Sequence, residues 1–188
     1  MTTNQMQNVQ PIRTTSEIAQ FIEAIILASP KTAERNVLLF KLGTSTGLRI
    51  GDIVKLRIEE VKGRSSVFVK EGKTKKTREV YLDDIMPEIA DYLDGQPSEG
   101  YLFASAKGGH ISTTQGYRAL AKAADMLGWD FIGTHSMRKT FGYFYYKKTN
   151  DLVTLSEILN HSSQQITRRY IGIRDEDIRE SVRGLGLF

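Results

Sequence analysis

The sequence predicts a mostly α-helical α+β domain with one small antiparallel β-sheet. Apolar residues recur at intervals of three and four positions through much of the chain, as they do between Ile18 and Ile26, and this spacing is typical of helices with one buried face. Two short runs of β-branched and aromatic residues, 67–69 and 79–82, flank a basic segment as the strands of a hairpin do. With 188 residues, 40% of them hydrophobic, the chain can bury the core of one sizeable domain.

Local start and stop signals predict where each helix lies. Residues 14–17 offer an N-cap for a first helix, which Ser29 and Pro30 end. A second helix is predicted over residues 33–44, and a short one over 50–56 after an intervening glycine. Further elements are a short apolar segment at 101–103 and helices over 86–93, 112–127, 135–148, 152–160 and 163–170.

We expect three stretches along the chain. Residues 1–13 are polar and predict a flexible N-terminal arm or linker, residues 14–174 form the main domain, and residues 175–188 form a C-terminal tail. The apolar positions of the tail would either fold back on their own domain or pack on a neighbouring protomer. The sequence favours neither arrangement.

The composition excludes several classes of chemistry. The absence of cysteine rules out disulfides, thiolate nucleophiles and cysteine-based zinc sites, and it is typical of a reducing cytoplasm. No apolar run approaches the roughly 18 residues that indicate a membrane span, and the first residues have no secretory signal pattern. The formal charge of +4 is compatible with a polyanionic partner.

The segment TGLRIGD at residues 46–52 places Arg49 between apolar neighbours, shortly after a glycine. Its side chain would either extend along the core to the surface or hold an anionic oxygen with its planar guanidinium group. Asp52, three residues on, is placed to hold that guanidinium across one helical turn.

The run GKTKKTR at residues 72–78 forms the predicted hairpin turn. A charged hairpin of this kind is most often a solvated turn. Alternatively, it reaches into a groove and contacts phosphates, with one lysine serving as a proton donor.

Two histidines stand close to other polar residues in the last third of the chain. His135 and Arg138 share one face of a predicted helix, and His161 precedes Tyr170. Taken singly, each has an ordinary structural interpretation as a surface pair, a buried histidine or a core tyrosine. The aromatic residues at 141–146 are likewise typical of a core.

Taken together, these residues resemble the catalytic domain of the tyrosine recombinase (phage integrase) family. Four blocks carry the resemblance in the family's order, namely TGLRI at 46–50, GKTKKTR at 72–78, HSMRKTF at 135–141, and LNHSS at 159–163 with a tyrosine nine residues after its histidine. Each block is weak by itself, whereas the ordered set is specific. The resemblance covers roughly residues 14–174 and implies the catalytic-domain fold of this family there.

The resemblance implies a nucleophile with an acid and a base. Tyr170 would attack a DNA phosphodiester and form a 3′-phosphotyrosyl intermediate. Because a free phenol has a pKa of about 10, it needs a base or a positive field. His135 would accept or relay its proton, and Lys73 would protonate the departing 5′-oxygen. The resemblance implies no metal and no other cofactor, because the phosphotyrosine retains the bond energy.

The other matched residues would bind the phosphate and the flanking DNA. Arg49 and Arg138 would hold the nonbridging oxygens, where negative charge develops. His161 would hydrogen-bond one of these oxygens, and Asp52 would orient the site from behind. The residues expected to contact the DNA backbone are Lys75, Lys76, Arg78, Arg168 and Arg169.

The sequence departs from the family pattern in three places. Asn160 replaces the usual glycine before the histidine, which disfavours a left-handed turn there without forbidding it. Lys139 stands where a histidine is frequent. The family's usual N-terminal helical DNA-binding domain does not fit into 13 residues, so we expect either an excised catalytic domain or a short recombinase.

The family resemblance also implies the partners. We expect double-stranded DNA, a homotetramer on DNA and a monomer free in solution, accessory DNA-bending proteins, no membrane, and a cytoplasmic location. Three rival interpretations remain open. They are a catalytically inactive or accessory DNA-binding module, a metal-dependent nuclease that uses His135 and His161, and a relaxing topoisomerase with the same chemistry.

Overall fold

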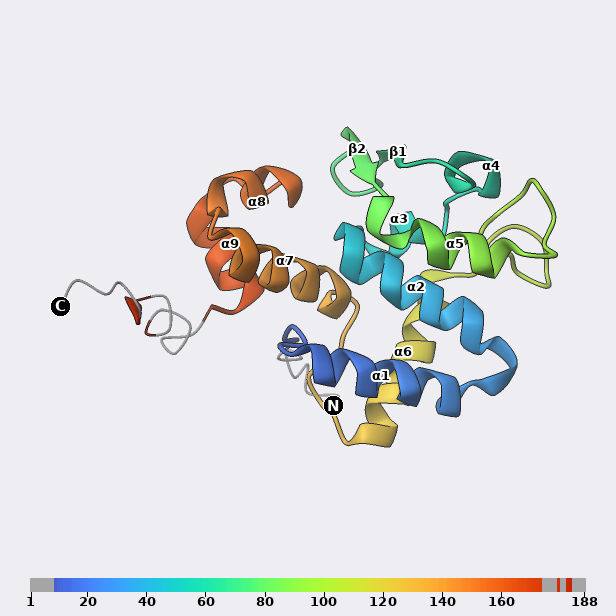
Figure 1. The fold of residues 1–188 in the computed structure, drawn as a ribbon, viewed down its shortest axis with the longest axis horizontal. Helices are drawn as coiled ribbons and strands as arrows, with labels where there is room; N and C mark the ends of the chain where they lie inside the picture. Colours follow the sequence, from blue (N-terminus) through green and yellow to red (C-terminus); the bar gives the residue numbers. More distant parts are fainter. Residues whose placement is uncertain (1–8, 174–178, 180–181, 184–188) are drawn as a thin grey trace, which may run out of the picture.

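The computed structural model describes residues 9–173, 179, 182 and 183. Its elements, in chain order, are α1 (Thr15–Ala28), η1 (Pro30–Thr32), α2 (Ala33–Thr46), α3 (Ile50–Ile53), α4 (Ile58–Val61), β1 (Ser66–Lys70), β2 (Thr77–Tyr81), η2 (Asp83–Ile85), α5 (Met86–Leu93), α6 (Thr113–Leu127), α7 (Ser136–Thr149), α8 (Leu152–Ile158) and α9 (Gln164–Ile171). Figure 1 shows them as a helical body with a small hairpin at one edge. The predicted mostly helical α+β class is confirmed.

The helix ends that shape the body follow from local hydrogen bonds. Thr14 caps α1, because its hydroxyl accepts from Glu17 N–H while Glu17 Oε2 accepts from Thr14 N–H, at 3.1 and 2.9 Å. Ser112 and Gln115 form the same reciprocal pair at the start of α6. These caps account for the agreement between the predicted and observed starts of both helices.

Gly47 ends α2 in a left-handed conformation, with φ of +64°. A Cβ at this position would lie 2.4 Å from Cδ1 of Phe141, so α7 packs directly on the turn. The turn carries Arg49 away from α2 and brings the backbone of Gly47 against α7.

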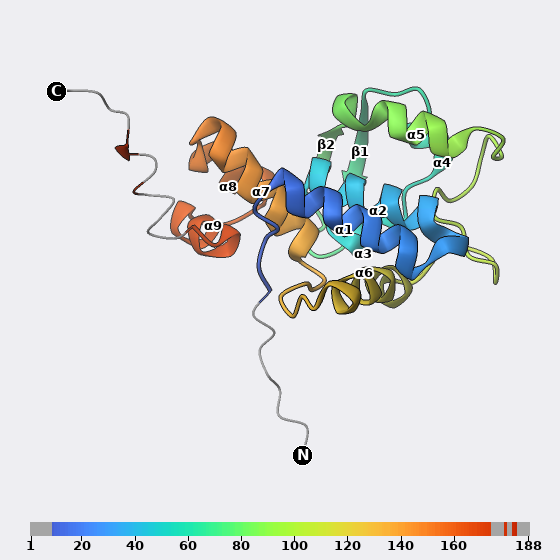
Figure 2. The same ribbon diagram turned by 60° about the horizontal axis from the view of Figure 1, so that its bottom comes forward.

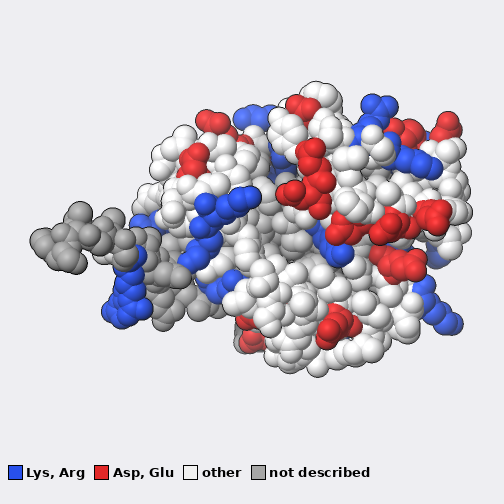
Figure 3. Space-filling model, viewed as in Figure 1, with Lys and Arg blue, Asp and Glu red and all other residues white. Residues whose placement is uncertain are grey.

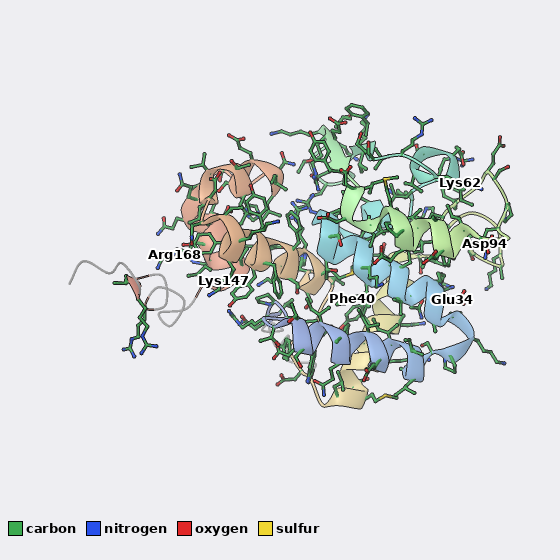
Figure 4. The ribbon with its side chains drawn as sticks, viewed as in Figure 1. Glu34, Phe40, Lys62, Asp94, Lys147 and Arg168 are labelled. Carbon is green, nitrogen blue, oxygen red and sulfur yellow. The ribbon has the colours of Figure 1, made fainter. Side chains whose placement is uncertain are left out.

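The main core lies between α1, α2 and α6. Phe21 of α1 stacks on Trp129 and tilts against Phe40 of α2, with ring centroids 5.5 and 5.0 Å apart. Figure 4 shows Phe40 between these helices. A smaller apolar cluster at the other end joins α8 and α9 through Leu155, Leu159 and Ile171. Figure 2 shows the same two parts from another side, with α7 running between them.

The hairpin β1–β2 is an antiparallel pair in which Val67 lies opposite Val80. Val67, Val69 and Val80 are buried, whereas the alternate residue Phe68 is 70% exposed. This alternation is that of a sheet with one face on the core. The two strands are joined by a turn at residues 71–76, which overlaps the turn predicted at 72–78.

Residues 9–13 lie differently from the flexible arm that we expected over 1–13. Ile12 is buried, and its N–H donates to Thr140 Oγ1 at 2.9 Å. Arg13 Nη2 donates to the carbonyl of Gly172 at 2.7 Å. An apolar side chain and two long-range hydrogen bonds thus fix this part of the segment to α7 and the end of α9. The first eight residues lie outside the described part.

The remaining sequence predictions concern two short segments, the C-terminal tail and membrane-spanning helices. The short helix predicted over 50–56 ends at Ile53, and the apolar segment 101–103 forms an isolated bridge with Arg57. The tail expected over 175–188 lies outside the described residues except for 179, 182 and 183. In the described residues, no helix has the length and apolar character needed to cross a membrane.

Candidate active site

The polar residues singled out in the sequence come together where α7 begins. Arg49 precedes α3, His135 precedes α7, and Arg138 lies on its first turn. His161 lies between α8 and α9, and Tyr170 lies near the end of α9. Burial lowers the pKa of both histidines, and the positive charge of Lys73, from the hairpin, adds to the shift of each. Segments far apart in sequence therefore share one site.

The Tyr170 hydroxyl points into this site. Its Oη lies 3.3 Å from Nδ1 of His135, and its ring meets the ring of His161 edge-on at 4.8 Å between centroids. Burial raises the pKa of Tyr170, and the positive charges of Arg138 and Arg49 oppose that rise without cancelling it. The phenol is therefore protonated at neutral pH and needs a base to become a nucleophile.

His135 is placed and tuned to be that base. Burial lowers its pKa, and the charges of Lys73, Arg49 and Arg138 lower it further. The imidazole is therefore neutral at pH 7 and has a lone pair to accept a proton. Because its Nδ1 faces the Tyr170 hydroxyl, the proton has a direct acceptor.

His161 is held by a chain of hydroxyl groups from α9 and α8. Burial, followed by the charge of Arg138, lowers its pKa to about 4. Its Nδ1 lies 3.0 Å from Thr167 Oγ1, and that hydroxyl lies 2.8 Å from Ser156 Oγ. Ser156 in turn donates to the carbonyl of Leu152 at 2.6 Å. This chain of hydroxyls fixes the orientation of the imidazole ring.

Arg138 is buried, at 2% exposure. Its Nη1 donates to the carbonyl of Gly47 and its Nη2 to the carbonyl of Leu159, the latter at 2.8 Å. Burial lowers its pKa to about 10, with Arg49 adding to the shift, so the guanidinium stays charged at neutral pH. Two backbone carbonyls from separate segments thus fix its plane.

Sequence reasoning missed Glu71, which lies at the centre of the arginine residues. Glu71 is fully buried, and its Oε2 accepts from Nη1 of Arg49 at 2.7 Å. Its Oε1 lies 3.4 Å from Nε of Arg78 and 3.8 Å from Nη1 of Arg138. The strand pattern contained a signal, since Glu71 is in phase with the inward-facing Val67 and Val69.

Asp52 does not hold Arg49, contrary to the contact that we expected across one helical turn. Its Oδ1 accepts from Gly72 N–H at 2.9 Å, and Arg49 pairs with Glu71 instead. The hairpin brings a carboxylate closer to the guanidinium than the helix does. Asp52 therefore fixes the hairpin turn next to Lys73.

The residues expected to contact DNA fall into two groups. Arg78 turns inward, pairs with Glu71 and donates from Nη2 to the carbonyl of Thr46 at 3.1 Å, so it differs from the exposed contact that we expected. The other group is exposed and consists of Lys75, Lys76, Arg168 and Arg169. Figure 4 shows Arg168 at the outer side of the helices α8 and α9.

The two departures within the matched blocks both make contacts in the site. Asn160 has φ of +49° and donates from Nδ2 to Glu71 Oε2 at 3.2 Å. Lys139 donates to the carbonyl of Val9 at 2.7 Å, and its ammonium lies 5.2 Å from the centre of the Tyr170 ring. In the described residues, no group of three or more His, Cys, Asp or Glu residues could hold a metal ion.

Comparisons with known proteins agree with this arrangement. The profile of the Phage integrase family matches residues 14–177. The "Probable integrase/recombinase YoeC" of Bacillus subtilis is 40% identical over 183 residues, which are 96% of this chain and 99% of that protein. The "Tyrosine recombinase XerC" of Bradyrhizobium diazoefficiens is 31% identical over 154 residues, 78% of this chain but 48% of that protein. The chain thus spans nearly all of the first relative and about half of the second.

Solved structures share the fold. XerH site-specific recombinase, in a post-cleavage complex with palindromic difH substrate, has a TM-score of 0.73 at 24% identity, covering 91% of this chain and 51% of that one. XerA recombinase has a TM-score of 0.70 at 22% identity, covering 92% and 62%. The predicted catalytic-domain fold is confirmed, and so is the predicted class of enzyme, a site-specific tyrosine recombinase. The chain belongs to the phage integrase family.

Proposed function

We propose that this chain cuts and rejoins double-stranded DNA through a covalent bond between Tyr170 and a 3′-phosphate. The observation that carries the proposal is the position of the Tyr170 hydroxyl, 3.3 Å from a neutral His135 and beside the guanidinium of Arg138. A nucleophile, a base and a cation for the phosphate therefore meet in one chain.

The first step exchanges one phosphoester bond for another. Tyr170 Oη attacks the phosphorus and gives its proton to Nδ1 of His135. The bond from phosphorus to the 5′-oxygen breaks, and Lys73 gives that oxygen a proton. The DNA then has a 3′-phosphotyrosyl end and a free 5′-hydroxyl end. Attack by the 5′-hydroxyl of another strand reverses these changes and restores a phosphodiester.

The guanidinium groups of Arg49 and Arg138 stabilise the charge that develops on the nonbridging oxygens. Hydrogen bonds to other groups of the protein orient both arginines. Groups that need no reorganisation when the reaction occurs stabilise a transition state most effectively. His161, oriented by Thr167, hydrogen-bonds one of the same oxygens.

The surface charge favours one approach of the DNA over another. Figure 3 shows acidic side chains gathered over α5 and the neighbouring part of α2. Glu34, Glu88 and Asp91 belong to these helices. This face repels phosphates, so DNA approaches from the side of the hairpin tip, where Lys73, Lys75 and Lys76 are exposed.

We further propose that the protein is a monomer in solution and a homotetramer on two DNA sites, assisted by DNA-bending proteins, in the cytoplasm. Support comes from the lambda integrase tetramer bound to a Holliday junction, which has the same fold with a TM-score of 0.65 at 18% identity. Strand exchange requires four cuts, and one active site makes one cut.

The test is covalent trapping on a DNA duplex nicked close to the scissile phosphate. Diffusion of the short cleaved fragment prevents rejoining, so an active enzyme accumulates as a protein–DNA adduct that survives denaturation. We expect an adduct with the native chain and none with Tyr170→Phe. Tyr81→Phe is the matched control, because Tyr81 is 69% exposed on the hairpin. An adduct in Tyr170→Phe would refute the assignment, and dependence of cleavage on a metal ion, tested with excess chelator, would favour a nuclease.

A further inference from the structure

Glu71 is a buried carboxylate to which the mechanism above gives no role. It follows β1 at the base of the hairpin turn, where its N–H donates to the carbonyl of Lys76 and its carbonyl accepts from Lys75 N–H, both at 2.9 Å. Lys73 lies inside the turn that these two bonds close. The backbone of Glu71 thus sets the base of the loop that carries the proposed acid.

The side chain of Glu71 joins that loop to the rest of the site. Its Oε2 accepts from Arg49, from Thr74 Oγ1 at 2.9 Å and from Asn160 Nδ2 at 3.2 Å. Its Oε1 faces Arg78 and Arg138. Four donors come from the residue before α3, the hairpin turn, the segment before α9 and β2, whereas Arg138 of α7 is an ion-pair partner at 3.8 Å. One carboxylate therefore accepts hydrogen bonds from four segments and forms an ion pair with a fifth.

Electrostatics explain why a carboxylate is needed at this point. Three guanidinium groups converge on Glu71, and two like charges in a partly buried site repel each other strongly. Burial would raise the pKa of Glu71, but hydrogen bonds from Arg49 and Thr74 and the charges of Arg49 and Arg138 outweigh it and lower the pKa. Glu71 is therefore ionised and compensates part of the positive charge.

We propose that Glu71 is the positioning residue of the recombination site, which holds Arg49 and Arg138 in the geometry that receives the scissile phosphate and ties the Lys73 loop to them. This inference rests on the proposed phosphotyrosyl reaction. A carboxylate repels the phosphate, so Glu71 acts through the arginines and does not touch the substrate. Asn160, the residue that departs from the family pattern, reinforces the same carboxylate.

The test separates DNA binding from the cleavage step. Glu71→Gln keeps the shape of the side chain but replaces one carboxylate oxygen by an NH2 group that faces other donors. Using the nicked duplex, we would measure the dissociation constant and the adduct formation rate at saturating DNA. We expect a rate about 100-fold lower, with a dissociation constant within roughly threefold of the control.

The matched control is Glu79→Gln. Glu79 is exposed on β2 and accepts from Ser66 Oγ at 2.6 Å, away from the arginines. Its replacement removes the same charge from the same hairpin, so it corrects for the general attraction of DNA. A role of Glu71 in folding alone would lower the amount of adduct and the affinity together, and would leave the rate of the folded fraction unchanged.

Two further variants keep the proposal testable if Glu71→Gln does not fold. Asn160→Gly suits the left-handed backbone and removes one donor to Glu71. We expect it to fold and to cleave about three- to tenfold more slowly. Glu71→Asp keeps the charge with a shorter reach, and we expect a rate between those of the native chain and Glu71→Gln.

The outcomes distinguish this inference from the function on which it rests. If the native chain forms no adduct, the proposed function fails and this inference falls with it. If the native chain forms the adduct and Glu71→Gln matches Glu79→Gln in rate, only the positioning role is overturned. If Glu71→Gln is unfolded, native rates in both Asn160→Gly and Glu71→Asp overturn it in the same way.

Discussion

The arginine side of the site and the tip of the hairpin differ in how firmly their charged groups are held. Arg138 is 2% exposed and donates to two backbone carbonyls. Lys73 is exposed, and no hydrogen bond joins its ammonium to any residue between 9 and 173. The groups proposed to stabilise charge are thus fixed by hydrogen bonds, whereas the group proposed to deliver a proton is not. The first prediction tests Arg138, the firmly held arginine.

The largest effect is expected from Arg138→Lys. Lysine keeps the charge but cannot donate in two directions from a rigid plane, so the carbonyls of Gly47 and Leu159 lose donors. We expect adduct formation at saturating DNA to slow by about 100- to 1,000-fold. We also expect the free energy of unfolding, measured in urea, to fall by about 2 kcal/mol. A variant with native stability would remove the contrast between the two sides.

The next effect is expected from Lys73→Ala at the exposed tip. Cleavage should slow by about 100-fold, because the 5′-oxygen leaves without a proton. The free energy of unfolding should stay within about 0.5 kcal/mol of the native value. A substrate with sulfur in place of the leaving 5′-oxygen should restore the rate, because a thiolate leaves without a proton. Lys70→Ala, at an exposed position of β1, is the control. An equal loss there would show a general charge effect.

The smallest effect is a dependence of the free energy of unfolding on pH, which arises from His161, a residue held in the site by Thr167. The pKa of His161 is lowered to about 4 in the folded chain, whereas an unfolded histidine has a pKa of about 6.5. Between these values the unfolded chain binds a proton that the folded chain does not bind. The contribution of His161 to the free energy of unfolding is therefore complete above pH 6.5 and is lost as the pH falls toward 4.

We expect a loss of about 1–2 kcal/mol over this range after allowance for solvent screening. Urea unfolding at several pH values measures it, and His161→Asn should show a shallower slope than the native chain. Equal slopes in the two proteins would mean that the surroundings of His161 do not lower its pKa in the folded chain.

The sequence predicted most elements of the fold because their signals are local. The apolar spacing and the caps at Thr14 and Ser112 are read within a few residues, and the helices they predict are present. The four blocks of the candidate site were found because their residue types occur in the order typical of a known family. This order, too, is read from the sequence alone. The placement of residues 9–13 was missed, because its partners Thr140 and Gly172 are distant in sequence.

Glu71, at the centre of the site, was missed although its strand phase points inward. It stands in a hairpin rich in charge, where a glutamate is ordinarily solvated. Its burial depends on Arg49, 22 residues earlier, and on Asn160, 89 residues later. The same distance effect explains the error over Asp52, since the nearest carboxylate along the chain is not the nearest in space.

The four donors around Glu71 and its ion pair with Arg138 also have a consequence for the exchange of parts between relatives. If the hairpin of one family member replaces that of another, the residue at position 71 comes from the donor protein. The arginines and the residue at position 160 remain those of the host protein. Chimaeras with a swapped hairpin would therefore fold and yet recombine poorly, until position 160 and the two arginines are matched to the insert. The hairpin and the segment before α9, 89 residues apart at Glu71 and Asn160, would therefore have to be exchanged together.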